Sequence, residues 1–137
     1  MEADVLGVPV PQGSKRVFNG RLVDVNDRKL KDWRALVGQM AASESSKLLL
    51  GPVSVRLDFY LPRPKGHFGS GRNAETLRPS APHVPETKPD IDKLVRACLD
   101  ALTGMAFRDD SQVAALHARK LYADDRQPGV HIEIEER

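Results

Sequence analysis

The spacing of the hydrophobic residues changes along this chain, and that change limits the fold class. Residues 53–60 alternate between apolar and polar side chains, which is the period of a strand with one buried face. Residues 30–41 and 91–102 instead repeat their apolar positions every three or four residues, as amphipathic helices do. The mixture predicts an α+β fold in which two main helices cover one face of a mixed β-sheet. Without internal repeats or a second domain, residues 1–137 are expected to form a single domain.

Five further short segments carry strand signals. The apolar run at residues 5–10 contains Pro9, with Pro11 just beyond it, which favours an edge strand over a central one. Asn19-Gly20 lies between two short strand-like segments, residues 16–18 and 21–23. This pattern predicts a hairpin with a type I′ turn. Residues 112–122 and 130–134 predict two final strands that pair with each other as a hairpin.

Length and cysteine content bound the class of protein. A chain of 137 residues buries roughly 68% of its unfolded surface, so it needs neither a metal nor a disulfide for stability. The single cysteine, Cys98, cannot form an internal disulfide, and the N-terminus lacks the pattern of a signal peptide. No apolar run approaches membrane-spanning length. We therefore expect a cytoplasmic protein in which any metal ion serves function.

The charges are distributed unevenly, although the formal net charge is only +2. Residues 1–88 hold 14 Lys and Arg against 9 Asp and Glu, whereas residues 89–137 hold 7 against 10. A basic half beside a carboxylate-rich half suits a polyanionic substrate that is presented to a metal site. Ordinary solvated surface charge explains the same counts equally well.

Residues 61–87 form the longest stretch without periodicity. The stretch is rich in proline and glycine, and its acids are only Glu75 and Glu86. Loops of this length inside a compact domain are usually functional or disordered, and a basic loop can wrap a phosphate backbone. A solvated loop without a function is the alternative. The cations of the stretch are Arg63, Lys65, Arg72 and Arg78.

Carboxylates gather at both ends of one helix-loop-strand unit. Asp90 and Asp92 begin the predicted helix at 91–102, and Asp109 and Asp110 precede the next strand. A helical Asp90 would point about 200° away from Asp92, so a shared ligand requires Asp90 to precede the helix as its N-cap. Singly, each aspartate is explained by capping, the helix dipole or a turn. Their combination in one unit favours a shared site.

Such carboxylates would need a cation. Two of them at about 4 Å repel by roughly 4 kcal/mol at an effective dielectric constant of 20. A site built only from oxygen atoms favours Mg²⁺ or Mn²⁺. Zinc is not expected, because Cys98 stands alone on an apolar stripe and the four histidines show no ligand spacing. On the helix itself, Asp92, Arg96 and Asp100 form one polar ridge.

Three motifs resemble the RusA family of Holliday junction resolvases, of the phage and prophage type. They are Lys88-Pro89-Asp90-Ile91-Asp92-Lys93-Leu94, Leu99-Asp100-Ala101-Leu102 and Asp109-Asp110-Ser111-Gln112-Val113. Residues 7–16 and Arg63-Pro64-Lys65 also resemble family members. The resemblance implies a homodimeric, Mg²⁺-dependent endonuclease, with Mn²⁺ as a substitute, in the cytoplasm of a bacterial or phage-infected cell. It would bind four-way DNA junctions by their shape and nick two opposed strands symmetrically in recombination and repair.

The resemblance also assigns roles by position. Asp90, Asp92 and Asp110 match the essential acids and would bind the metal ion, with Asp109 as their supporting neighbour. Arg96 stands where the family has a lysine; it keeps the charge but not the capacity to transfer a proton, so we expect it to contact phosphate. A DNA-binding protein that has lost cleavage, and a nuclease that prefers flaps or replication forks, remain the alternatives. The expected DNA-contacting residues are Lys15, Arg16, Arg63, Lys65, Lys88, Lys93 and Lys120.

Overall fold

The protein combines one four-stranded sheet, a separate two-stranded hairpin and two α-helices. The computed structural model describes residues 1–13, 15–24 and 27–137, without the side chains of residues 15–18, 22–24 and 27. Three short 3₁₀ turns, η1 (Lys65–His67), η2 (Gly71–Asn73) and η3 (Asp110–Gln112), lie in the connections. The other elements are β1 (Glu2–Leu6), β2 (Lys15–Phe18), β3 (Arg21–Asp24), α1 (Asp27–Glu44), β4 (Val53–Leu61), α2 (Ile91–Leu102), β5 (Val113–Tyr122) and β6 (Gly129–Glu136).

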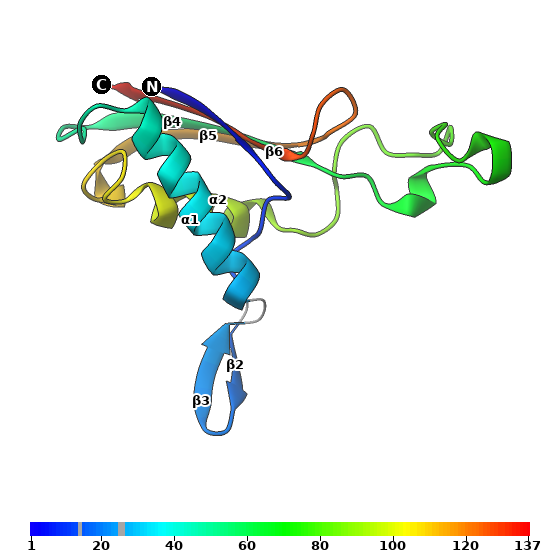
Figure 1. Cartoon of the computed structure of the whole chain (residues 1–137), viewed down its shortest axis with the longest axis horizontal. Helices are drawn as coiled ribbons and strands as arrows, with labels where there is room; N and C mark the ends of the chain where they lie inside the picture. The colour runs from blue at the N-terminus through cyan, green and yellow to red at the C-terminus, as the bar shows by residue number, and fades with distance from the viewer. Residues whose placement is uncertain (14, 25–26) are drawn as a thin grey trace.

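The four-stranded sheet has the order β1-β6-β4-β5. β1 and β4 both run antiparallel to β6, whereas β5 runs parallel to β4, so the sheet is mixed. Both α-helices lie on one face of this sheet (Figure 1). This arrangement confirms the predicted α+β class and leaves the other face of the sheet without a helical cover.

The alternation at residues 53–60 does form a central strand, as its sequence predicts. β4 lies between β6 and β5 and turns alternate side chains toward the helices and toward the open face. The helix-facing side chains are fully buried or nearly so, since burying apolar surface is the main force that holds a sheet to its helices. They are Val53, Val55, Leu57, Phe59 and Leu61.

The two helices complete the core and pack closely on each other. A Cβ atom placed on Gly38 of α1 would lie 3.1 Å from the carbonyl oxygen of Ala101 in α2, so glycine permits this close crossing. None of the described helices is both long and apolar enough to cross a membrane. The buried helical side chains are Leu30, Trp33, Val37 and Ala41 of α1 and Leu94, Ala97, Cys98, Ala101 and Leu102 of α2.

The first strand is an edge strand, as expected, but the predicted position at residues 5–10 is wrong. β1 covers Glu2–Leu6 and buries Ala3 and Val5 against the helices. Gly7 has a φ of 143°, and its N–H donates to the carbonyl of Pro128. The chain therefore leaves the sheet before the prolines, whose missing N–H groups could not continue the ladder.

The predicted terminal hairpin of β5 and β6 is also wrong, because β4 lies between them. Their connection passes the end of β4, where the N–H of Ala123 donates to the carbonyl of Leu61. None of the β5 side chains is fully buried, whereas Val130, Ile132 and Ile134 of β6 are. β6 thus takes an inner position between β1 and β4, and β5 forms the edge of the sheet.

The Asn19-Gly20 hairpin is confirmed. β2 and β3 pair antiparallel, with φ angles of 50° at Asn19 and 76° at Gly20, as a type I′ turn requires. Figure 1 shows this hairpin beyond the end of α1, away from the sheet. The sequence predicts Asn26 or Asp27 as the N-cap of the helix at residues 30–41. Asp27 is instead the first residue of α1, and Asn26 lies outside the described residues.

Residues 62–90 form a second projection that extends from the end of β4 and returns to α2 (Figure 1). It contains η1, η2 and a short bridge between Phe68 and Leu77, so the segment is partly structured. The base of the segment is tied to the sheet by Arg63, whose side chain is only 5% exposed. The guanidinium of Arg63 makes two hydrogen bonds to Asp124, at 2.7 and 3.0 Å, and lies 4.1 Å from the centre of the Tyr122 ring.

Candidate functional site

At the start of α2, Asp90 precedes the helix, which is the placement that a carboxylate site shared with Asp92 requires. Asp90 is the N-cap residue with extended backbone angles, φ −72° and ψ 137°, so it precedes the helix. Its side chain makes no capping hydrogen bond, and its carboxylate is 45% exposed, 3.9 Å from the ammonium of Lys93. A purely capping role therefore does not describe Asp90, because its side chain accepts no hydrogen bond from the first N–H groups of the helix.

Asp92 begins the polar ridge of α2. One of its carboxylate oxygens accepts a hydrogen bond from the N–H of Lys93 at 3.0 Å, and the side chain is exposed in the first helical turn. Arg96 and Asp100 follow at intervals of four residues, so they share one face of the helix with Asp92. Arg96 is exposed and Asp100 is half-buried.

The loop after α2 brings the second pair of carboxylates to this ridge. The N–H of Ser111 donates to Asp109, and this hydrogen bond lowers the pKa of the Asp109 carboxyl. A hydrogen bond with Asp109 raises the pKa of Asp110, and the negative charges of Asp109 and Asp100 raise it further, while Arg96 opposes them. Asp110 is thus crowded by negative charge at the protein surface.

The structure gathers the predicted site residues only in part. Asp110 interacts with Asp109, Asp100 and Arg96, whereas Asp90 and Asp92 lie toward the other end of α2. Among the described residues, the carboxylates of Asp90, Asp92 and Asp110 do not form a group whose oxygens all approach within 4.8 Å. Their shared metal binding stays a prediction.

Asp100 is a further candidate residue that was missing from the predicted set. The sequence places it on the same ridge as Asp92 and Arg96, and this spacing is the signal that identifies it. The structure adds the proximity to Asp110, which comes from the loop that follows the helix.

Gln112 holds the loop that carries Asp109 and Asp110. Its side-chain NH₂ donates to the carbonyls of Leu49 and Gly51, both at 2.9 Å. Its side-chain oxygen accepts from the N–H groups of Arg108 and Asp109, at 2.8 and 2.9 Å. One half-buried amide therefore joins the carboxylate loop to the segment between α1 and β4.

We expect Gln112→Ala to lower the free energy of unfolding by about 2 kcal/mol, because it leaves four backbone groups without this partner. Urea unfolding measures the loss. Gln127→Ala, in the exposed turn before β6, is the matched control and should unfold like the wild type. Equal stability of the two variants would contradict the anchoring role of Gln112.

Two of the predicted DNA-contacting residues are engaged within the protein. Arg63 is bound to Asp124, as described above. The ammonium of Lys120 donates to the carbonyls of Thr87 and Pro89, at 2.8 and 2.9 Å, and so fixes the chain just before Asp90. Lys65 and Lys88 are exposed and Lys93 is half-buried beside Asp90. The side chains of Lys15 and Arg16 lie outside the described part of the chain.

A groove between α1 and α2 borders the site. Its volume is about 530 Å³, and its lining includes Lys31 and Arg34 from α1 together with Asp100 and Met105. The basic residues Lys31 and Arg34 of α1 therefore line the same groove as Asp100 of the polar ridge of α2. The sequence places these cations on the solvent-facing side of α1. It could not predict that α2 lies across a groove from them, because local spacing does not identify which helices pack together.

The acids fit a hard divalent cation by their chemistry. The predicted ligands offer only oxygen atoms, which Mg²⁺ and Mn²⁺ prefer. All three are exposed, and exposed side chains change rotamer within nanoseconds, so they can adjust to an ion. The raised pKa of Asp110 reflects carboxylate crowding that a cation would relieve.

Comparison with known proteins places the chain in a family. A family model described as endodeoxyribonuclease RusA matches residues 7–135, nearly the whole chain. The uncharacterized protein YqaN of Bacillus subtilis (strain 168) is 33% identical over 135 residues, which cover 96% of this chain and 93% of the relative. The matched region includes the ridge of α2, the carboxylate loop and the segment that projects from β4.

Proposed function

Because the chain belongs to the RusA family of endodeoxyribonucleases, we propose that it is a Mg²⁺-dependent nuclease that resolves four-way DNA junctions by paired nicks in two opposed strands. The observation that carries the proposal is the crowding of Asp110 with Asp109 and Asp100 beside Arg96. An exposed group of acids next to a guanidinium suits a reaction in which a metal ion and a cation meet a phosphodiester.

Asp90, Asp92 and Asp110 would hold Mg²⁺, for which Mn²⁺ can substitute. When bound, the ion lowers the pKa of a water molecule and neutralises charge that develops on the phosphate. Lys120 fixes the backbone before Asp90, and Gln112 fixes the backbone N–H groups of Arg108 and Asp109. The protein thus positions the carboxylates from two separately anchored segments.

Arg96 would bind the phosphate that is cut. A guanidinium remains charged at all physiological pH values and presents a planar fork that matches two phosphate oxygens. It cannot readily donate or accept a proton during the reaction, so proton transfer falls to water and the carboxylates. Asp109, whose carboxylate is bonded to Ser111, would hold the loop in the shape that presents Asp110.

The two projections suit contact with branched DNA. Residues 62–90 carry Lys65, Arg72 and Arg78, and the β2–β3 hairpin begins with Lys15 and Arg16. Phosphate contacts by such side chains supply most of the affinity for DNA and make it depend on salt. Symmetric nicking of two strands requires two active sites, so we propose a homodimer as the acting species.

Incubation with a synthetic four-way junction, a replication fork and a linear duplex tests this function. We expect paired, symmetric nicks in the junction that require Mg²⁺ or Mn²⁺. Binding without cutting would support a structural DNA-binding protein, and cutting of the fork in preference to the junction would assign a different branched substrate. The absence of both binding and cutting would contradict the proposal as a whole.

A further inference from the structure

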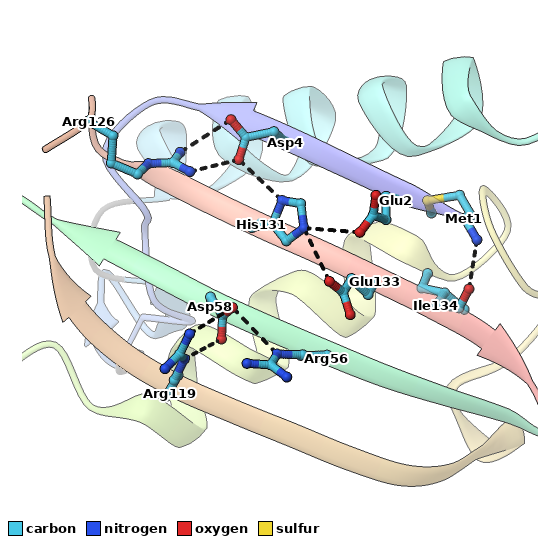
Figure 2. A network of polar contacts seen from close by, with 10 residues as sticks. All are labelled: Met1, Glu2, Asp4, Arg56, Asp58, Arg119, Arg126, His131, Glu133 and Ile134. Carbon is cyan, nitrogen blue, oxygen red and sulfur yellow. Dashed lines mark hydrogen bonds and ion pairs between the residues drawn. The ribbon is translucent and has the colours of Figure 1, made fainter.

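The face of the sheet opposite the helices carries charged side chains in registered rows (Figure 2). Cross-strand neighbours in a sheet point to the same face, so the register defines these rows. On β4 and β5 the cations outnumber the acids, since the one buried carboxylate, of Asp58, pairs with Arg119 at 2.7 Å and with Arg56 at 3.5 Å. One row contains Asp4, His131, Asp58 and Arg119, and the next contains Glu2, Glu133, Arg56 and His117.

On β1 and β6 the carboxylates outnumber the cations. Three carboxylates, from Glu2, Asp4 and Glu133, surround the imidazole of His131 (Figure 2). Arg126 pairs with Asp4 at 2.9 Å, which compensates one of the three. The remaining negative charge lies around the Nε2 atom of His131.

The geometry around Nε2 is that of a ligand set. Nε2 lies 3.6 Å from a Glu2 oxygen and 3.5 Å from a Glu133 oxygen, and the three ligand atoms are all within 4.8 Å of one another. Both distances exceed the roughly 2.7–3.2 Å of an N–H···O hydrogen bond, and one N–H cannot point at two carboxylates at once. Tetrahedral zinc, with bonds of 2.0–2.2 Å, separates its ligand atoms by about 3.3–3.5 Å. The two distances from Nε2 are close to that value.

The other ring nitrogen of His131 faces a carboxylate. Nδ1 lies 3.6 Å from a carboxylate oxygen of Asp4, an ion-pair distance that is longer than a hydrogen bond, and that carboxylate is itself held by Arg126. Arg126 is in turn fixed over the ring of Tyr60 at 4.1 Å. A carboxylate on the far nitrogen orients a histidine ligand and directs the lone pair of its other nitrogen toward the metal ion.

We propose that Glu2, His131 and Glu133 form a binding site for a divalent transition metal ion, Zn²⁺ foremost, with Asp4 orienting the histidine. The mixed nitrogen and oxygen donors suit zinc rather than Mg²⁺. Three protein ligands leave a fourth position for water. Because Glu2 belongs to β1 and the other two ligands to β6, the ion joins the edge strand to its neighbour across their open face.

This site is separate from the acids of α2 and does not depend on the proposed nuclease function. The helices lie on the opposite face of the sheet, so neither ligand set contributes to the other. Cys98 does not compete for zinc, since burial raises the pKa of its thiol to about 12. The sequence did not indicate the site, because its third ligand comes from a strand more than a hundred residues away.

Zinc titration of the tag-free protein by calorimetry tests the proposal. We expect one Zn²⁺ per chain at this site, and a loss of affinity of at least about tenfold in His131→Gln and Glu2→Gln. Asp4→Asn should weaken binding by about 10- to 100-fold, as such orienting partners do. The matched controls on the same face are His117→Gln and Glu135→Gln, which should bind zinc like the wild type.

Two further readouts decide the assignment. Co²⁺ bound at the proposed site should give the intense visible absorption of a four-coordinate ion, and His131→Gln should remove it. Zinc should also raise the melting temperature of the wild type and of Asp92→Asn, but not that of His131→Gln. Absence of zinc binding, or binding that all the ligand variants retain, would overturn the proposal. Circular dichroism confirms that each variant is folded.

Discussion

Asp92→Asn is expected to abolish junction cleavage while leaving junction binding and stability unchanged. Asn keeps the shape of the side chain and can still accept the hydrogen bond from the N–H of Lys93. It removes the negative charge that would bind the metal ion. Removal of one group that stabilises the transition state lowers rates by about 10²- to 10³-fold, and we expect a loss at the upper end for a metal ligand.

The measurement needs separate assays for binding and cutting. Single-turnover cleavage in Mg²⁺ gives the rate, and fluorescence anisotropy in Ca²⁺ gives the affinity for the same junction. Asp125→Asn, an exposed aspartate in the turn before β6, is the matched control and should cut like the wild type. Cleavage by Asp92→Asn at the wild-type rate would remove Asp92 from the site.

Asp100→Asn extends the same experiment to the residue that the structure adds. Asp100 raises the pKa of Asp110, so the two carboxylates are close enough to interact. If Asp100 only shapes the charge around Asp110, its substitution lowers the rate less than Asp92→Asn does. An equal loss would make Asp100 a direct participant in catalysis.

Local sequence signals predicted the elements that local interactions determine. Asn19-Gly20 specifies a turn with two positive φ angles, and the hairpin formed as predicted. The two-residue spacing of Asp90 and Asp92 predicted that Asp90 precedes α2, and Asp90 is the N-cap residue of that helix. The alternation in β4 indicated both a strand and a buried face. In each case the physical cause lies within a few residues.

Features that depend on distant strands were not predictable in this way. The order of β4, β5 and β6 is a matter of pairing between strands that lie far apart in the sequence, and the two final strands gave similar local signals. The cluster at His131 needs the register between β1 and β6. Arg63 is predicted as a DNA-contacting cation, and its hydrogen bonds to Asp124 could not be predicted with it, because Asp124 is 61 residues further along the chain.

Arg63→Ala is expected to destabilise the protein and to loosen the segment at residues 64–87. The side chain is almost fully buried, bonds to Asp124 and to the carbonyl of Pro82, and stacks on Tyr122. Loss of these contacts should lower the free energy of unfolding by about 2 kcal/mol. Amide hydrogen exchange should become faster in residues 64–87, because this segment loses its tie to the sheet.

Asp124→Asn separates this structural role from DNA contact. If Arg63 acts as an anchor, Asp124→Asn should show the same faster amide exchange as Arg63→Ala. Arg63→Lys should also exchange faster than the wild type, because lysine lacks the planar fork of arginine. The hydrogen bond from Arg63 lowers the pKa of Asp124. The stabilisation is therefore complete above the ordinary pKa of an aspartate and is lost as pH falls through the lowered value.

Lys65→Ala is the matched comparison, since Lys65 is an exposed cation two positions further along the same segment. It should keep the wild-type stability and exchange rates but reduce the slope of log affinity against log salt by about one. If Arg63 instead contacts DNA directly, Arg63→Ala reduces that slope while Asp124→Asn leaves it unchanged. Faster exchange in both Arg63→Ala and Asp124→Asn, with an unchanged salt slope in each, would establish that Arg63 holds the basic segment in place. Together with the reduced salt slope of Lys65→Ala, it would establish that this segment binds DNA through its exposed cations.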